Sequence, residues 1–358
     1  MEKICVFCGK RPETKTNEHV LPKWLIKLTG DPSRKANFGF YIDGSDVKTR
    51  TFSFDAFKFP ACSDCNELFS AVEGQAKTII EQMLDSNPIR GKDLSVLLDW
   101  FDKVRVGIWL GSLYLNKLYS EIEPVYQIHK RIGAYDRMLG IFHNQEMTQR
   151  LNMIGTESPI FSITPSCFGL ITNHIYFLNI SYPFLFARRI GFPYPSTTWF
   201  RPDTRMHETE LEMGRERVMR PLFRKPFSLR GTYLFQPMFR YQTSPECRPY
   251  YDTPYVRARC QDWNNGVGLV FLQSNSDLVP YPARPSRDWI PPIKYSTEVI
   301  KKSVTIQVFR GQIMTHDELC SSTELLALEQ RKYIRKLVAD GRKFNEKVIR
   351  VLERTHDI

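Results

Sequence analysis

Apolar residues recur every three to four positions over residues 92–119, which predicts an amphipathic helix. Its apolar face is formed by Leu94, Leu97, Leu98, Phe101, Val104 and Ile108. We expect this helix to pack against the residues that precede it. A second helical pattern covers residues 317–355, with a predicted break near Asp340 and Gly341. Its charges are nearly balanced, which favours a docking helix or a dimer arm over a nucleic-acid-binding helix.

An apolar run at residues 168–187 is about as long as a segment that crosses a bilayer. It contains polar residues and a proline that are costly in hydrocarbon, namely Asn173, His174, Asn179 and Pro183. We therefore interpret the run as two buried strands, at 167–171 and 175–181, joined by a turn at 172–174. No membrane-spanning helix and no membrane partner are expected.

Residues 188–259 are rich in proline, aromatic residues and arginine. Because prolines at this density exclude long helices, the pattern predicts short strands and ordered loops around an aromatic core. The whole chain carries a formal charge of +11, and most of this surplus lies in the same segment. A surplus of this size favours a polyanionic partner such as nucleic acid.

Length and composition limit the class of protein. A chain of 358 residues is expected to hold two domains or more, and 42% apolar and 25% charged residues are typical of a globular protein. The N-terminal residues show no apolar segment after a basic start, so we predict no secretory signal and a cytoplasmic location. In that reducing compartment the 8 cysteines are expected to be metal ligands or buried side chains.

Two Cys-x-x-Cys pairs, Cys5 with Cys8 and Cys62 with Cys65, lie on either side of a segment at 27–57 that we interpret as an elaborated loop. Each pair can supply two thiolates from one tight turn, and four thiolates complete the tetrahedral shell that zinc prefers. Such a zinc ion would be structural, because no coordination position stays open. The alternative is four structural cysteines without a metal.

The segment between the two pairs reads Thr-Asn-Glu-His-Val-Leu-Pro-Lys-Trp-Leu at 16–25, and Asn-Glu-Leu-Phe-Ser follows the second pair at 66–70. This combination resembles the HNH, or ββα-metal, endonucleases of a zinc-stapled bacterial branch. The resemblance covers about residues 1–85. It implies a DNA phosphodiester hydrolase, and its bacterial relatives suggest an antiphage defence or toxin effector.

The resemblance also implies the roles of the site residues. His19 would be the general base, since a neutral imidazole suits proton transfer at cellular pH. Glu18 and Asn66 would bind a catalytic Mg²⁺ or Mn²⁺ ion, with Glu73 as an additional ligand. Asn66, Ser70 and Glu73 have the i, i+4, i+7 spacing of one helix face.

The sequence differs from the HNH endonucleases that it resembles at one position, where they usually have an asparagine that supports the loop carrying the general base. Upstream of Cys62 the chain has Asp55 and Phe57, and Asp55 is the candidate substitute. This departure supports the alternative function, a catalytically weak or inactive zinc-containing protein that binds nucleic acid or acts as a scaffold.

We therefore predict an α+β protein with three parts: a zinc-stapled nuclease module at 1–91, a helical and then β-rich domain at 92–316 that binds substrate or senses a trigger, and a C-terminal helical segment at 317–358. DNA is the expected partner, RNA is the open alternative, and a second copy or another protein would dock on the C-terminal helix. Contacts to the nucleic-acid backbone are assigned to Arg217, Arg220, Arg224, Lys225 and Arg230.

Overall fold

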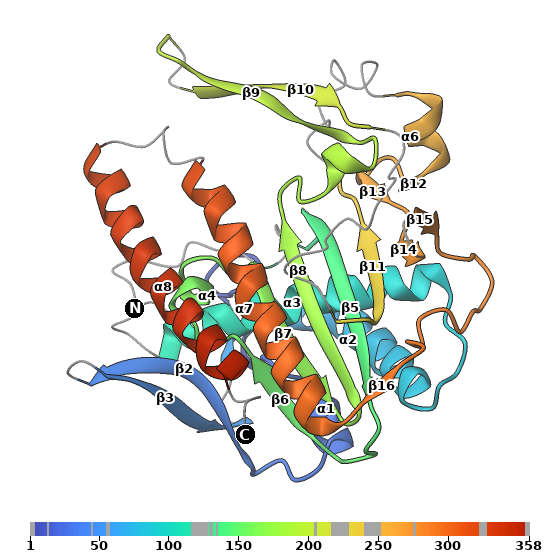
Figure 1. Ribbon diagram of the computed structural model, residues 1–358, viewed down its shortest axis with the longest axis vertical. Coiled ribbons are helices and arrows are strands. Elements are labelled where there is room, and N and C mark those ends of the chain that lie inside the picture. The colour runs from blue at the N-terminus through green and yellow to red at the C-terminus, as the bar shows by residue number, and fades with distance from the viewer. Residues whose placement is uncertain are drawn as a thin grey trace.

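The chain forms a mixed structure of helices and mainly antiparallel strands, which confirms the predicted α+β class. A computed structural model shows their arrangement (Figure 1). It describes residues 4–12, 14–43, 46–54, 58–115, 128, 132–133, 135–203, 206–215, 229–239, 252–274, 277–321 and 328–354.

A short antiparallel strand pair organises the N-terminal part. β1 (Lys15–His19) pairs with β4 (Lys58–Cys62), and α2 (Ser63–Leu84) begins directly after β4. α1 (Lys23–Leu28) follows β1. The strands β2 (Lys35–Asp43) and β3 (Asp46–Ser53) then form a hairpin. The prediction of a loop at 27–57 is therefore wrong for most of that segment, because its β-branched and aromatic residues pair as strands.

Helix α3 (Gly91–Leu115) confirms the helix predicted at 92–119 as far as residue 115; residues 116–119 lie outside the described part. It packs against the N-terminal elements as expected. A Cβ atom at Gly107 would lie 3.3 Å from the Phe59 ring on β4. On the other side of the helix, the Phe101 ring centroid lies 5.2 Å from that of Phe177. α3 thus lies between the strand pair and the central sheet.

The central sheet has the order β15-β14-β11-β5-β8-β7-β6, and β16 pairs in parallel with β5. Its strands are β5 (Asp136–Asn144), β6 (Leu151–Ile154), β7 (Cys167–Thr172), β8 (Ile175–Tyr182), β11 (Thr232–Gln236), β14 (Phe271–Ser274), β15 (Asp277–Pro280) and β16 (Lys294–Tyr295). The predicted strands at 167–171 and 175–181 are confirmed as the hairpin of β7 and β8.

Both faces of this sheet are covered, which explains the apolar run. On β7, Phe168 and Leu170 belong to the core shared with α3, whereas Cys167 and Ile171 belong to the core shared with α7 (Thr297–Ser321). A strand buried on both faces shows no polar alternation. Figure 1 shows α7 in front of the sheet and α3 behind it. Among the described residues, no helix is long and apolar enough to cross a membrane.

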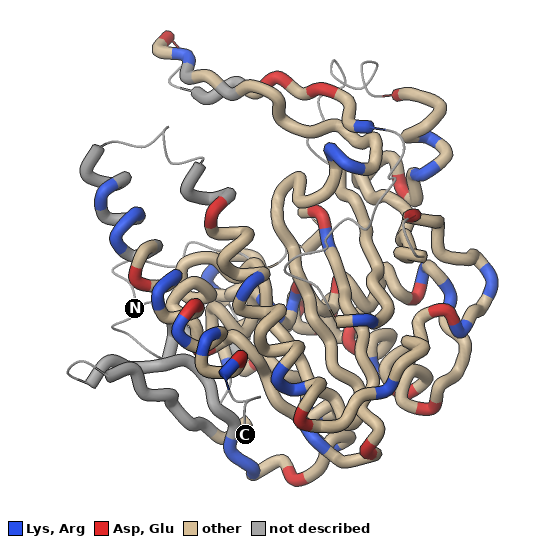
Figure 2. Tube along the Cα trace, viewed as in Figure 1, with Lys and Arg blue, Asp and Glu red and all other residues tan. Residues whose placement is uncertain are grey.

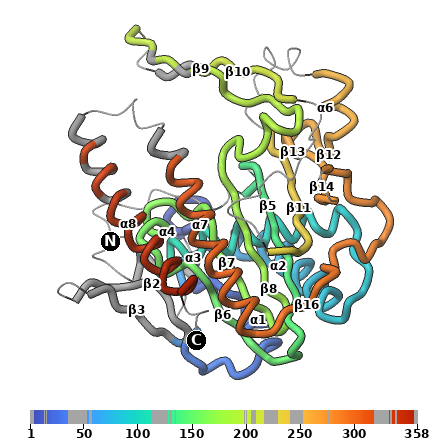
Figure 3. The backbone as a smooth tube through the Cα atoms, in the orientation of Figure 1, coloured from blue at the N-terminus to red at the C-terminus, as the bar shows by residue number. Residues whose placement is uncertain are grey.

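The C-terminal helices form an antiparallel pair (Figure 3). α8 (Leu328–Arg354) packs on α7 and on the short helix α4 (Pro159–Ile163). The predicted break near Asp340 and Gly341 is wrong, because α8 continues through both residues. Gly341 is required by close packing instead: a Cβ atom there would lie 2.9 Å from Cγ1 of Ile160.

The described part of 188–259 consists of short elements, as predicted. β9 (Pro193–Arg201) and β10 (Met206–Met213) form a hairpin that extends away from the sheet (Figure 1). α6 (Pro254–Ala258) follows, and then β12 (Cys260–Asp262) and β13 (Val267–Gly268). An aromatic cluster supports this region, with ring centroids 5.6 Å apart for Phe192 and Phe239.

The predicted domain boundaries at 91 and 316 can be placed among the observed elements. Residue 91 lies between α2 and α3, yet one hydrophobic core joins Phe7 and Phe59 of the N-terminal part to Trp100 of α3 and Leu139 of the sheet. Residue 316, the predicted end of the second domain, lies inside α7, which begins at Thr297. The start of α7 escaped the sequence pattern because this helix is covered both by the sheet and by α8.

Candidate functional site

The first Cys-x-x-Cys pair forms a tight turn. The Cys5 carbonyl accepts a hydrogen bond from the Gly9 amide at 2.8 Å, and the Cys5 amide donates to the Lys10 carbonyl at 2.9 Å. Gly9 has φ 72°, in the left-handed region that glycine adopts without steric cost. The turn thus brings both sulfurs of the pair to one side.

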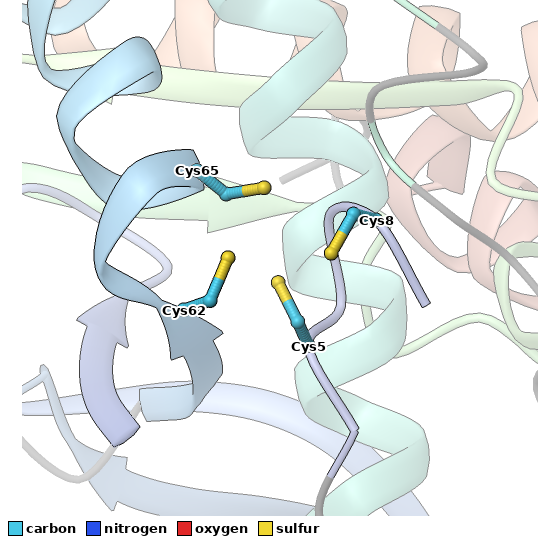
Figure 4. A group of neighbouring side chains, drawn as sticks. All are labelled: Cys5, Cys8, Cys62 and Cys65. Carbon is cyan, nitrogen blue, oxygen red and sulfur yellow. The ribbon is translucent and has the colours of Figure 1, made fainter. Parts of the chain in front are cut away.

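The second pair lies at a junction between strand and helix. Cys62 ends β4 and caps α2, and Cys65 lies in the first turn of α2. Figure 4 shows all four cysteine side chains directed toward a common point. Their sulfur atoms lie within 4.8 Å of one another. Tetrahedral zinc with Zn–S bonds of ~2.3 Å needs sulfurs ~3.8 Å apart, so this cluster could bind a metal ion such as zinc.

The electrostatics of the sulfurs agree with a cation site. Burial acts to raise the pKa of the Cys5 thiol, but hydrogen bonds from the backbone amides of Cys8, Cys62 and Phe7 lower it below its ordinary value. Burial and then the neighbouring sulfur groups raise the pKa of Cys65. Since thiolates in so small a volume repel one another, a bound cation would stabilise the deprotonated cluster.

Glu18 on β1 contacts a residue that the sequence analysis missed. Nζ of Lys103 on α3 lies 2.7 Å from Oε1 of Glu18 and also donates a hydrogen bond to Oε1 of Glu73 on α2. The Lys103 side chain is 1% exposed, and that of Glu18 is 11% exposed. One buried ammonium group therefore joins two carboxylates from separate elements.

Aromatic rings complete the surroundings of Lys103. Its Nζ lies 5.6 Å from the ring centroid of Phe7 and 5.9 Å from that of Phe69. Phe7 belongs to the first cysteine turn, and Phe69 lies one helical turn after Cys65, so the lysine and the cysteine cluster share neighbours. Burial raises the pKa of Glu73, although Lys103 acts to lower it. The one signal in the sequence was a lysine inside the apolar part of a predicted helix.

His19 and Asn66 lie on the same two elements as Glu18 and Glu73, namely β1 and α2. His19 is the last residue of β1 and pairs with Lys58, and the ladder continues through it without a register shift. Because side chains alternate along a strand, this register directs Glu18 and His19 to opposite faces. Asn66 lies half-buried in the first turn of α2, and its Cα is about 10.5 Å along the helix from that of Glu73. The structure thus brings Glu18 and Glu73 together through Lys103.

Lys103 opposes the predicted binding of Mg²⁺ or Mn²⁺ by Glu18 and Glu73. Oε1 of Glu18 and Oε1 of Glu73 each accept a hydrogen bond from the Lys103 ammonium group. A divalent cation at the same oxygens would be repelled by that positive charge. In the described part of the chain, the four cysteines are the one group of three or more His, Cys, Asp or Glu residues arranged to hold a metal.

Several predicted residues lie outside the described part: Asp55, Arg217, Arg220, Arg224 and Lys225. Arg230 is described and exposed, and its carbonyl accepts a hydrogen bond from the Tyr295 hydroxyl at 3.0 Å. No family model matches the chain, and no curated protein or solved structure matches it either.

Proposed function

We propose that residues 1–91 form an HNH-type endonuclease module that hydrolyses DNA phosphodiester bonds, with zinc at Cys5, Cys8, Cys62 and Cys65 as a structural ion. One observation carries this proposal. β4 pairs with β1 and leads into α2, the cysteine cluster lies at that junction, and Glu18 with His19 ends β1. This order of elements agrees with the ββα arrangement that the sequence motifs imply.

In this proposal His19 accepts a proton from the attacking water, which needs a neutral imidazole within reach of the scissile phosphate. The four cysteines would hold the zinc ion between the turn at Cys5 and the start of α2, where it would be structural and supply no chemistry to the reaction. Asn66, which directly follows Cys65, is held in place by the same junction. The setting we propose for this activity is defence against phage or a toxin effector.

A cleavage assay tests the proposal. Zinc-loaded protein is incubated with plasmid, single-stranded DNA and RNA in Mg²⁺ or Mn²⁺, next to the His19→Ala variant. We expect cleavage by the wild type and a loss of at least about a hundredfold in the variant, the usual range for a general base. Lys58→Ala changes the cross-strand neighbour of His19 and serves as the matched control. Equal cleavage by wild type and His19→Ala would refute the proposal.

One observation favours a second candidate, a nucleic-acid-binding or scaffold protein that has lost turnover. Lys103 contacts the carboxylates that would otherwise bind the catalytic ion. Titration with Mn²⁺, followed by calorimetry and elemental analysis, separates the two candidates. One tight zinc ion and a weak exchangeable Mn²⁺ site support the enzyme. Zinc alone in the wild type, together with a Mn²⁺ site gained in Lys103→Met, supports the protein without turnover.

A further inference from the structure

Helix α8 exposes a row of basic side chains along its length. These are Lys332, Lys336, Lys343, Lys347, Arg350 and Arg354, which we name the α8 basic stripe. At 100° per residue they fall within an arc of about 60°, and at 1.5 Å per residue they extend over about 33 Å. All of these side chains are exposed. In Figure 2, Lys and Arg residues recur along α8.

The opposite face of α8 is buried and holds the stripe outward. Asn345 donates a hydrogen bond to Oε1 of Gln312 on α7 at 2.9 Å and accepts one from Ser158 at 2.6 Å. Gly341 packs on Ile160, and Ile349 is 8% exposed. Among the described side chains of α8, Val351 is the large apolar one that is exposed. A single exposed apolar side chain gives no apolar face that could insert into a lipid headgroup region.

Three acidic residues of the two C-terminal helices, Asp317, Glu346 and Glu353, pair with arginines outside the stripe. Nη1 of Arg342 lies 2.6 Å from Oδ1 of Asp317, and Nε of Arg342 lies 2.9 Å from Oε1 of Glu346. Nη2 of Arg310 lies 2.6 Å from Oε1 of Glu353. Among the described acidic side chains of α8, Asp340 is the one paired with the stripe, 3.6 Å from Lys343. The acidic and basic residues of 317–358 are therefore nearly balanced in number, but the α8 basic stripe has an excess of positive charge.

We propose that the α8 basic stripe binds the phosphate backbone of a nucleic acid. A straight row of exposed cations with no apolar residue among them complements duplex DNA, which carries one negative charge per ~1.7 Å of its axis. The stripe would position the nucleic acid without reading its sequence. This inference rests on the nucleic-acid substrate of the proposed function and names the surface that holds it.

Fluorescence anisotropy with zinc-loaded protein and a labelled 30-base-pair duplex, without added Mg²⁺ or Mn²⁺, tests the inference, because a metal-dependent activity then leaves the DNA uncut. The variant combines Lys336→Glu, Lys343→Glu and Lys347→Glu. We expect its affinity to fall at least about tenfold, and the slope of log K against log salt to become shallower by up to about 2.7. A matched variant with the same change in net charge combines Lys92→Glu, Lys294→Glu and Lys301→Glu, which are exposed and lie outside α8. We expect less than a threefold loss for it.

An unchanged salt slope in the stripe variant, or an equal loss in the matched variant, would overturn the inference. Binding of the wild type to phosphatidylserine vesicles but not to DNA would also overturn it. The corresponding Lys→Gln triple variant, which avoids introducing new acidic groups, should show an intermediate loss. His19→Ala should bind DNA like the wild type, so that lost cleavage with retained binding bears on catalysis alone and leaves the stripe supported.

Discussion

Nζ of Lys103 on α3 lies 2.7 Å from Oε1 of Glu18 on β1, and the same ammonium group bonds to Glu73 on α2. This buried interaction crosses the predicted boundary at residue 91. It connects the strand that bears the candidate catalytic residues to the helix that supports the central sheet. Residues 1–91 therefore contact the rest of the chain through the buried ion pairs of Lys103 as well as through a shared hydrophobic core.

Replacing Lys103 by methionine should destabilise the protein by about 3–5 kcal/mol, because it leaves two buried carboxylates without their cation. Urea unfolding measures the change. Lys77→Met removes an exposed lysine that lies 3.8 Å from Glu81, and its effect should stay within about 1 kcal/mol. Adding Glu73→Gln to Lys103→Met should recover part of the loss. Equal stability of the Lys103→Met and Lys77→Met variants would contradict the role assigned to this ion pair.

Removal of zinc should unfold the N-terminal junction. Structural zinc in small modules contributes on the order of 10 kcal/mol in apparent binding energy, and that energy is coupled to folding. Chelation, or Cys8→Ser and Cys65→Ser, should abolish bound zinc in elemental analysis and lower the melting temperature. Cys260→Ser changes a half-buried cysteine outside the cluster and should retain the metal. Full zinc content in the Cys65→Ser variant would argue against a four-sulfur site.

Stability should fall as pH rises through neutrality because of Asp136. This buried carboxylate accepts backbone hydrogen bonds from Met238 at 2.9 Å and from Phe186 and Ala187 at 3.1 Å. Burial outweighs these bonds and raises its pKa to about 7. The folded state thus holds the proton more tightly than the unfolded state, so the stabilisation is complete below about pH 4 and is lost as pH rises through 7.

Denaturant unfolding at pH 5 and pH 8 measures this effect. We expect the Asp136 contribution to decline by about 2 kcal/mol over that interval. The Asp136→Asn variant should lack this part of the pH dependence, although it is less stable than the wild type at pH 5 because it loses an acceptor. Parallel pH profiles for the two proteins would show that Asp136 does not titrate in this range.

Two glycines within helices should respond in opposite directions to alanine. Gly341→Ala places a Cβ atom 2.9 Å from Ile160 and 3.3 Å from its backbone nitrogen, so α8 must shift at a cost of about 1–3 kcal/mol. At Gly74 on α2 a Cβ atom would meet nothing within 4 Å. There the substitution should stabilise the protein by about 0.5–1 kcal/mol through helix propensity. Calorimetric melting of both variants checks the contrast in sign.

Local patterns in the sequence were sufficient for several parts of this structure. The 3.6-residue period at 92–119 predicts α3, because that helix buries a broad apolar face. The spacing of Cys5 with Cys8 and of Cys62 with Cys65 predicts a four-sulfur cluster, because each pair needs only a tight turn. The apolar run at 168–187 predicts the buried strands at 167–171 and 175–181, although it does not reveal which neighbours cover them.

Contacts between distant segments were decided by the tertiary structure alone. Lys103 meets Glu18 only when α3 packs on β1, and a sequence pattern carries no information on that crossing. In the sequence Gly341 indicates a helix break, whereas in the structure α8 continues through it and Ile160 packs against it. The charges of residues 317–358 are nearly balanced along the chain, but Asp317, Glu346 and Glu353 pair with Arg310 and Arg342, which lie outside the α8 basic stripe. Local geometry repeats along a chain and can be predicted from it, whereas partners brought together by folding depend on how all the elements pack.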